Sequence, residues 1–431
     1  MAKLIIAIDD TDSNDGMCTT YIMTLIIEYL KGNNFEIIDF PRLVRLNPSI
    51  PYKTRGNAAL SIEININEKN YTVDKNKIIN FIIKLIKEKS MVSSKNTNPG
   101  SIFLEEKQYQ IIKDTLKNFY FKALRDIVTI KEAMSIVIEY NINHFLLKNG
   151  RGIIGSLAAA GYILISNDIK DYTYELLTYR DPNLFGSKRF FFEDTFIIFD
   201  KKTYPKTWDT IDYSKKKKLI CISHSKDPVL YGIRGNDYNI LNSSKNYLIS
   251  EHVDKYCIFK TNQSTDEHII YIESYSKMKN LCSYRIKGMV DNKSRTIIGG
   301  HVFIDIKDKY GVIFTCAAYE KTGNFRKIIK KLIPGDIIEV FGSFKNNTVN
   351  LEKINIIFLN KEYITENPRC HICGHKMKSR GTNKGYKCKK CKIITNKKII
   401  SEKIRDINIG YYEVTPDARR HLSKPIIRIK N

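Results

Sequence analysis

The stretch Ile5-Ile6-Ala7-Ile8-Asp9-Asp10-Thr11-Asp12-Ser13, which runs into Gly16-Met17-Cys18-Thr19-Thr20, decides how the first part of the chain folds. Residues 4 to 8 form an unbroken apolar run, which predicts a strand buried inside a sheet. From Tyr21 the apolar residues repeat at helical spacing, at Ile22, Leu25, Ile26, Tyr29 and Leu30. The loop therefore joins a buried strand to the start of a helix.

This loop carries three carboxylates, those of Asp9, Asp10 and Asp12. Mg²⁺ prefers carboxylate and phosphate oxygens, and the free N–H groups at a helix start favour an anion. We therefore expect the loop to hold both the metal and the phosphates of a nucleotide. The alternative is a polar turn in which Asp and Ser side chains act as caps.

Length and charge indicate a multidomain protein with a polyanionic partner. The 431 residues, 42% of them hydrophobic, suffice for three or four domains with their own cores. The net charge is +25, and the 71 residues from Lys361 onward carry 19 basic and 6 acidic side chains, or +13. Nucleic acid is the simplest partner for this asymmetry, although an AT-rich genome also enriches Lys, Ile and Asn.

Targeting signals are not apparent in the sequence. No apolar run approaches the roughly 18 to 20 residues of a membrane span, and Met1 leads straight into the first strand without a signal peptide. We therefore expect a cytoplasmic protein without a membrane partner. Nine cysteines, four of them in two close pairs, fit metal ligation in a reducing compartment better than disulfides.

The two cysteine pairs predict a Zn²⁺ site. Cys370 and Cys373, then Cys388 and Cys391, form two C-x₂-C units separated by 14 residues. Four thiolates at this spacing can surround a tetrahedral zinc ion, which leaves His371 and His375 no vacancy. A closed four-cysteine site is structural. Its many lysines and arginines, with Tyr386 among them, indicate a surface that contacts phosphates.

Short alternating strands precede this module. They are expected at Tyr284–Val290, Ile297 to Asp305, Val312–Phe314, Ile337–Phe341 and around Val349–Leu351, with a helix from Asn324 to Leu332 in the third gap. This order is typical of an OB-fold barrel, which stacks single-stranded bases on aromatic side chains. The candidates, which alternation cannot distinguish from core residues, are Phe303, Phe314, Tyr319 and Phe341.

A glycine-containing segment in the middle of the chain allows two interpretations. Gly150, Gly152 and Gly155 would fit a phosphate loop, but their order is not a Walker A motif, and a tight helix entry fits at least as well.

Several motifs together resemble the archaeal 2-agmatinylcytidine synthetases that modify the minor isoleucine tRNA. The resemblance extends from residue 4 to residue 427. Besides the opening loop and the four cysteines, it is carried by Lys53-Thr54-Arg55-Gly56-Asn57, Tyr174-Glu175-Leu176, Val229-Leu230-Tyr231-Gly232-Ile233-Arg234-Gly235, Thr261-Asn262-Gln263-Ser264-Thr265-Asp266-Glu267-His268 and Ala418-Arg419-Arg420-His421-Leu422-Ser423-Lys424-Pro425.

The resemblance implies an activity and a domain order. Enzymes of this family use ATP to join agmatine to C2 of the wobble cytidine, so that the tRNA reads AUA. The implied architecture is multidomain, α/β and all-β. It has a kinase-like α/β catalytic domain (1–145), a ferredoxin-like α+β domain (146–278), an OB-fold (279–360) and a zinc-ribbon with a basic C-terminal tail (361–431). Only the last two follow from the residues themselves. We expect this tail to be separable from the ATP site.

The resemblance also implies roles for individual residues. Asp9, Asp10 and Asp12 match the carboxylates that hold metal and ATP. Thr19 most nearly matches an autophosphorylated threonine, with Thr20 adjacent. Lys53 and Arg55 are expected to neutralise phosphate charge. Agmatine is a dication, and its candidate acidic partners are Glu175, Asp266 and Glu267.

Two other functions compete with this interpretation. A non-catalytic single-strand binder would explain the barrel and the zinc module but not the three aspartates. A small-molecule ATP-dependent kinase would explain the aspartates but not the basic C-terminal part. The sequence gives no prediction of the oligomeric state.

Overall fold

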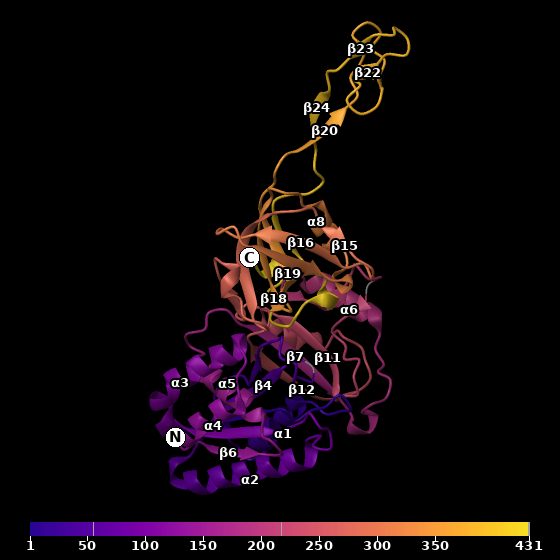
Figure 1. Cartoon of the computed structure of the whole chain (residues 1–431). Helices are drawn as coiled ribbons and strands as arrows, with labels where there is room; N and C mark the ends of the chain where they lie inside the picture. Colours follow the sequence, from indigo (N-terminus) through magenta and orange to yellow (C-terminus); the bar gives the residue numbers. More distant parts are fainter. Residues whose placement is uncertain (55, 217, 430–431) are drawn as a thin grey trace.

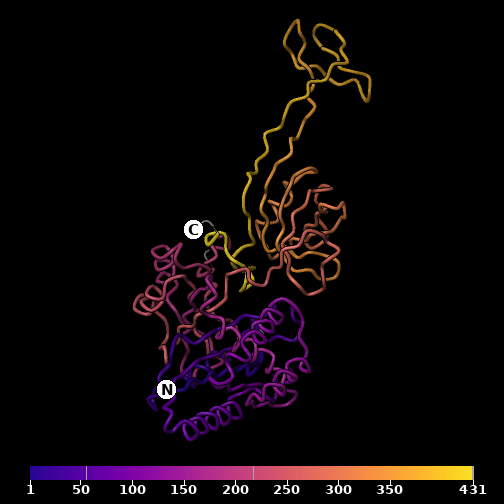
Figure 2. The backbone as a smooth tube through the Cα atoms, turned by 90° about the vertical axis from the view of Figure 1, so that its left-hand side faces the viewer, coloured from indigo at the N-terminus to yellow at the C-terminus, as the bar shows by residue number. Residues whose placement is uncertain are grey.

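The computed structural model describes residues 1–54, 56–216 and 218–429. A mixed α/β body carries a β-barrel, and a small module projects beyond the barrel on a two-stranded stalk (Figure 1). The side view in Figure 2 shows the same separation, with the module far from the body.

The body is built on one ten-stranded sheet. In pairing order its strands are β6 (Asn143–Leu146), β5 (Gly100–Glu105), β1 (Ala2–Asp9), β4 (Ala58–Ile66), β3 (Arg42–Arg45), β12 (Val253–Thr261), β7 (Thr173–Arg180), β11 (Val229–Gly235) and β8 (Thr207–Trp208), with β2 (Glu36–Ile37) on β4. Its helices are α1 (Thr19–Gly32), α2 (Tyr71–Lys89), α3 (Glu106–Arg125), α4 (Ile130–Glu139), α5 (Gly152–Leu164), α6 (Glu193–Thr203) and α7 (Tyr238–Ser244). Shorter elements of the body are η1 (Glu68–Asn70), η2 (Pro182–Leu184) and the pair β9 (Ile211–Asp212) and β10 (Lys218–Leu219).

The expected buried strand is β1, which pairs with β4 and β5 near the middle of the N-terminal half of the sheet. Ile5 and Ala7 pack in the core with α3, α4 and α5, whereas Leu4, Ile6 and Ile8 pack on the opposite face with α1 and α2. Helices cover both faces, so every position of the strand needs an apolar side chain. This explains why the run is continuous rather than alternating.

The first two expected domains share this sheet. Strand β12 pairs in parallel with β3, with Lys260 opposite Arg42, so strands from beyond residue 145 extend the N-terminal sheet. Helix α5 also follows residue 145, yet it packs in the core formed by β1 and α3. The sheet and this core are therefore continuous across the expected boundary.

The barrel confirms the expected strand and helix order. Its strands β14 (Ser283–Val290), β16 (Val302–Lys307), β17 (Ile313–Ala318), β19 (Thr348–Phe358) and β18 (Ile337–Lys345) close a ring, because β18 pairs with β14. Helix α8 (Phe325–Lys331) lies between the third and fourth strands in chain order. The accompanying elements are β13 (Ile269–Tyr271), η3 (Tyr275–Lys277), β15 (Arg295–Thr296), η4 (Glu320–Thr322) and β25 (Gly410–Glu413).

The four candidate stacking aromatics occupy different environments. Phe314 is buried in the barrel core, where it stacks on Tyr275. Phe341 is also buried, with Arg285 over its ring and Tyr411 beside it. Phe303 and Tyr319 remain partly accessible and contact each other edge to face. Of the four candidates, only Phe303 and Tyr319 are therefore accessible for stacking with bases.

The zinc module is an insertion and not the end of the chain. Its stalk pairs β20 (Glu362–Glu366) with β24 (Ile399–Lys403), and its small sheet consists of β21 (Lys378–Ser379), β22 (Tyr386–Lys387) and β23 (Ile394–Thr395). Tyr386 is buried among the cysteines, so the expectation that it interleaves with surface lysines is wrong.

The chain then returns to the body. Strand β25 pairs with β19 of the barrel, and η5 (Pro416–Ala418) and α9 (Ile426–Ile429) follow. The expected basic tail is therefore a packed segment. Among the helices of the described residues, none is long and apolar enough to cross a membrane.

Candidate active site

A cavity of about 480 Å³ collects most of the residues expected to act together. It lies where the loop after β1, the start of α1, the segment before β4 and the start of α5 face strands β7 and β11. Its lining includes these expected site residues: Asp9, Asp10, Asp12, Thr19, Lys53 and Glu175. Asp266 and Glu267 are described but do not line it.

The three aspartates lie at the end of β1 and in the loop that follows. Asp10 has a left-handed backbone, with φ of 59°, and its Oδ2 lies 3.1 Å from Nη2 of Arg151. Burial raises the pKa of Asp10 to about 6 against the opposing effect of Arg151. Burial, with the adjacent Asp10, raises the pKa of Asp9 well above its usual range. The cluster therefore disfavours full ionisation unless a cation joins it.

A divalent cation fits these donors if the nucleotide supplies further ligands. Among the described side chains, only the four module cysteines bring three or more potential ligand atoms within 4.8 Å of one another. The aspartates alone therefore form no closed cage. Mg²⁺ is usually held by one or two carboxylates, with waters and phosphates completing its shell. Asp9, Asp10 and Asp12 suit that arrangement.

Helix α5 passes so close to Asp9 that only glycine fits. A Cβ atom on Gly155 would lie 1.9 Å from Oδ2 of Asp9, and one on Gly152 would lie 2.6 Å from the Asp9 carbonyl oxygen. Of the two interpretations of these glycines, the structure supports the tight helix entry. The helix fixes the side chain of Asp9 against the sheet.

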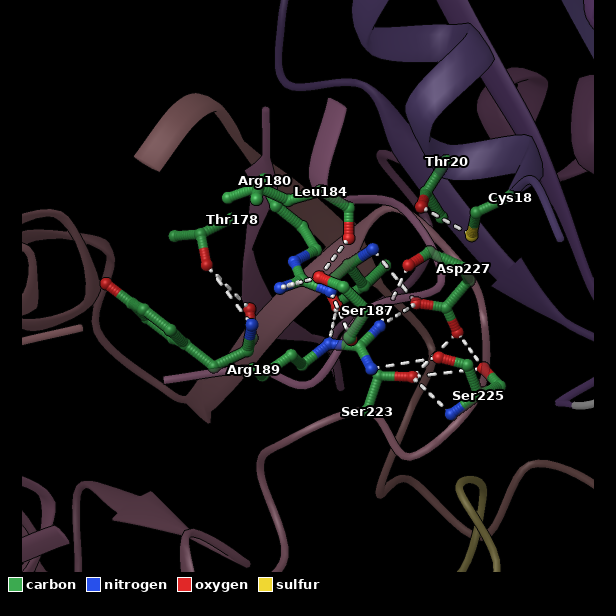
Figure 3. Close-up of polar contacts among 12 residues, drawn as sticks. Cys18, Thr20, Thr178, Arg180, Leu184, Ser187, Arg189, Ser223, Ser225 and Asp227 are labelled. Carbon is green, nitrogen blue, oxygen red and sulfur yellow. Dashed lines mark hydrogen bonds and ion pairs between the residues drawn. The ribbon is translucent and has the colours of Figure 1, made fainter. Parts of the chain in front are cut away.

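The two threonines at the start of α1 differ in their contacts. The Thr11 hydroxyl donates to Oγ1 of Thr19 at 3.0 Å, and the Thr19 hydroxyl donates to Oδ1 of Asp12 at 3.4 Å. Oγ1 of Thr20 instead lies 3.0 Å from Sγ of Cys18 (Figure 3). Thr19 is thus the threonine bonded to the aspartate loop. The N-cap position of α1 is Cys18, whose side chain makes no capping hydrogen bond.

Glu175 is held between two arginines. Its carboxylate lies 3.0 Å from Nε of Arg234 and 3.5 Å from Nη2 of Arg45, and it accepts a hydrogen bond of 2.6 Å from Gln263. Burial alone would raise the pKa of Glu175, but Arg234 and Arg45 hold it below the usual value. Its charge is therefore neutralised within the chain.

Asp266 and Glu267 are placed elsewhere. Oδ2 of Asp266 lies 2.6 Å from Nζ of the buried Lys353, and Oδ1 accepts from the backbone N–H of Lys424. Glu267 accepts a hydrogen bond of 2.6 Å from the Tyr120 hydroxyl, and burial raises its pKa. Neither residue lines the cavity.

Cations gather at one side of the cavity. Lys53 lies at its rim, where the ammonium bonds to the Pro48 carbonyl oxygen while much of the side chain stays exposed. Partial burial, with Arg420 and Arg45 nearby, lowers its pKa to about 8. Burial also lowers the pKa of Arg45 to about 10. Arg55, expected to act with Lys53, lies outside the described residues.

The segment before β11 forms the wall facing the start of α1. Arg189 donates to the Val229 carbonyl oxygen at 2.9 Å and to Oδ1 of Asp227 at 3.1 Å, and the Asp227 carboxylate also accepts from the hydroxyls of Ser223 and Ser225 (Figure 3). These bonds hold the loop in one shape beside the cavity.

The four module cysteines converge as expected. Their sulfur atoms all lie within 4.8 Å of one another, and tetrahedral zinc with bonds of about 2.3 Å requires separations of about 3.8 Å. Hydrogen bonds from the N–H groups of Cys373 and Ile372 lower the pKa of Cys370 to about 6, whereas hydrogen bonding with Cys373 raises the pKa of Cys391 to about 12, so the four thiols share their protons within one cluster. Cys370, Cys373, Cys388 and Cys391 therefore fit Zn²⁺.

Sequence reasoning missed two kinds of cavity residue. Arg151 lies between Gly150 and Gly152, and its position next to a helix start is the one sequence signal that suggests a partner for a carboxylate. Arg419 and His421 lie some 410 residues after the aspartate loop and also line the cavity. Only their place in the C-terminal motif of the resemblance pointed to them.

The body thus brings an acidic loop and a group of cations together in one cavity, and a basic four-cysteine module stands apart from it. Family models described as the TiaS TCKD domain, the TiaS FLD domain and the TiaS C-terminal zinc ribbon domain match residues 5–149, 150–268 and 367–407. The chain belongs to the TiaS family, the 2-agmatinylcytidine synthetases of the minor isoleucine tRNA.

Individual relatives are similar over their whole length. The 2-agmatinylcytidine synthetase TiaS of Methanosarcina mazei is 42% identical over 99% of this chain and 97% of its own. A complex of TiaS with its isoleucine tRNA and ATP is 40% identical with a TM-score of 0.88, covering 99% of this chain and 98% of that one. A complex of TiaS with its isoleucine tRNA, AMPCPP and agmatine is 38% identical with a TM-score of 0.86, at 99% and 98% coverage.

Proposed function

We propose that this protein joins agmatine to C2 of the wobble cytidine of the minor isoleucine tRNA, with ATP as the source of activation. The observation that carries this proposal is the cavity, in which the acidic loop of this TiaS family member faces a group of arginines. Relatives of this fold bind their isoleucine tRNA together with ATP, or with AMPCPP and agmatine, as the names of their complexes state.

The chemistry requires the cytosine O2 atom to become a leaving group. Transfer of a phosphoryl group from ATP forms an O2–P bond and breaks the P–O bond to the nucleotide. The primary amine of agmatine then attacks C2, inorganic phosphate leaves with O2, and the amine loses a proton. Most of the catalysis in phosphoryl transfer is positioning and charge stabilisation.

The residues of the cavity suit these tasks. Asp9, Asp10 and Asp12 would hold Mg²⁺, which supplies charge neutralisation at the phosphates when bound. Arg45 and Lys53 would neutralise phosphate oxygens on the opposite side, with Arg55 as a further candidate. Thr19 offers a hydroxyl at the helix start, where a transferred phosphoryl group would be favoured.

The three acidic candidates, Glu175, Asp266 and Glu267, are bonded to partners within the chain. We propose that they position other residues of the site and do not bind agmatine directly. Glu175 orients Arg45 and Arg234 through its two ion pairs. Asp266 anchors the C-terminal segment through Lys424 and Lys353. Glu267 holds Tyr120 beside the same segment.

We propose the domain names on similar grounds. Residues 1–145 form the kinase-like domain, 146–278 the ferredoxin-like domain, 279–360 an OB-fold and 361–431 the zinc ribbon with its return segment. The closed five-strand barrel with a helix before its fourth strand supports the OB assignment. A reaction on tRNA with ATP supports a cytoplasmic location.

Mass spectrometry tests the function directly. A transcript of the minor isoleucine tRNA is incubated with the protein, ATP and agmatine, and the wobble cytidine should gain agmatine with loss of water. ATP turnover should depend on both tRNA and agmatine. Turnover without tRNA would favour a small-molecule kinase, and tRNA binding without any turnover would favour a non-catalytic binder.

A further inference from the structure

The segment after the zinc module completes the cavity. Residues 415–428 run between the barrel and the body, and Pro416, Asp417, Arg419 and His421 line the cavity. The segment is firmly held: the guanidinium of Arg419 pairs with Asp209, and the backbone N–H groups of Ser264 and Asp266 donate to the carbonyl oxygens of His421 and Leu422 at 2.8 and 2.9 Å. Its side chains are therefore fixed parts of the site.

The contacts of His421 define which ring nitrogen carries the proton. Nη2 of Arg234 lies 2.8 Å from Nδ1 of His421. An arginine can only donate, so Nδ1 must accept and Nε2 must carry the hydrogen in a neutral ring. Among the described residues, none forms a hydrogen bond with Nε2.

The Nε2 atom lies beside the cations of the cavity. A Cβ atom on Gly56 would be 3.1 Å from Nε2 of His421 and 2.1 Å from Nη1 of Arg45. The glycine thus leaves room for the two groups on one side of the cavity. Burial, together with Arg45, Arg234 and Lys53, lowers the pKa of His421 well below its usual range, so the imidazole stays neutral.

We propose that the Nε2–H of His421 donates a hydrogen bond to a phosphate oxygen of ATP, in the same anion site as Arg45 and Lys53. This inference rests on the proposed function, which supplies the triphosphate. Glu175 pairs with both Arg45 and Arg234, and Lys53 adds a further positive charge beside them, so this side of the cavity favours an anion. A neutral imidazole adds a directed donor there without adding another charge.

Two substitutions separate donation to ATP from support of Arg234. In His421→Gln the side-chain amide can place an N–H near the position of Nε2. In His421→Asn the amide oxygen can replace Nδ1 as the acceptor for Arg234, but nothing reaches the Nε2 position. We would measure ATP affinity by titration calorimetry without tRNA, and the rate of tRNA modification in a single turnover.

The proposal expects His421→Asn to weaken ATP binding about tenfold to a hundredfold, as for a lost hydrogen bond to a charged group, and His421→Gln to restore most of it. The single-turnover rate should follow the same order. The reverse order would assign His421 to holding Arg234 and overturn the proposal. Equal losses in both variants, or no loss in either, would overturn it as well.

The calorimetric result is independent of the proposed reaction. If the unaltered protein binds ATP and the two variants differ as expected, but no agmatine reaches the tRNA, the proposed function fails and the role of His421 stands. If agmatine is transferred and the variants do not differ, the proposed function stands and the role of His421 fails.

Discussion

Replacing Asp10 with asparagine should stabilise the protein while removing its ATP turnover. Burial raises the pKa of Asp10 from 3.8 to about 6, so the fold disfavours the ionised carboxylate. At about 1.36 kcal/mol for each tenfold change in proton affinity, the ionised form destabilises the folded state by about 3 kcal/mol. The side chain is only 11% exposed, so solvent screens little of this, and the attraction of Arg151 is already included.

The effect has a defined dependence on pH. Between about pH 4 and pH 6 the folded protein keeps a proton on Asp10 that the unfolded chain has released. The free energy of unfolding of the unaltered protein therefore falls as the pH rises through this window, because the folded state binds the Asp10 proton more tightly than the unfolded chain. Asp10→Asn lacks the fall, so its advantage should be small below about pH 4 and approach about 3 kcal/mol at neutral pH.

Urea unfolding of both proteins, below about pH 4 and at neutral pH, measures this difference in the free energy of unfolding. Trp208, the one tryptophan of the chain, lies on β8 of the sheet that also contains β1, the strand directly before Asp10, and it reports the unfolding of that sheet. Asp15→Asn, at an exposed position of the same loop, is the control and should change stability by less than about 0.5 kcal/mol. An Asp10→Asn protein that is less stable at neutral pH, or equally shifted at both values, would refute the reasoning. ATP turnover should be lost in the same variant with tRNA affinity nearly unchanged.

Three further changes test the architecture. Gly155→Ala should abolish ATP turnover and lower the melting temperature, because its Cβ would lie 1.9 Å from Oδ2 of Asp9, whereas Gly32→Ala, with open space around it, should do neither. Direct joining of Glu362 to Lys403, which pair across the stalk, removes the zinc module. Filter-binding assays should then show weaker tRNA binding with a shallower salt dependence, and calorimetry an unchanged ATP affinity. Metal analysis should give one zinc ion per chain, and Cys388→Ser should eliminate it and unfold the module alone, so that retained zinc or lost ATP binding would contradict the assignment.

Features with a local physical cause could be predicted from the sequence. The run from Leu4 to Ile8 is apolar throughout because helices cover both faces of β1, and this pattern needs no knowledge of distant residues. The four cysteines converge because two tight turns aim each pair, which their spacing already indicates. The barrel strands alternate because one face of each lies in a common core.

Features set by distant contacts could not be predicted. Glu175 has the chemistry of a ligand for a cation, but Arg45 and Arg234 reach it from other strands and satisfy its charge. The same is true of Asp266, whose partner Lys353 lies on the barrel. An isolated carboxylate in a sequence does not reveal whether its partner is within the chain or a substrate.

The C-terminal segment shows why chain order misleads about which parts can be separated. The zinc module begins and ends at paired residues of one stalk, and its metal site contributes folding energy locally. Strand β25 then rebuilds contact with the barrel, and His421 reaches the cavity. A cut at residue 360 would therefore remove two unrelated things, a basic surface and part of the cavity wall, so we now expect deletion of the whole tail to weaken ATP binding as well as tRNA binding. A chain truncated after Glu413 should keep zinc and the stalk but lose ATP affinity in calorimetry, and preserved affinity would show that the wall is dispensable.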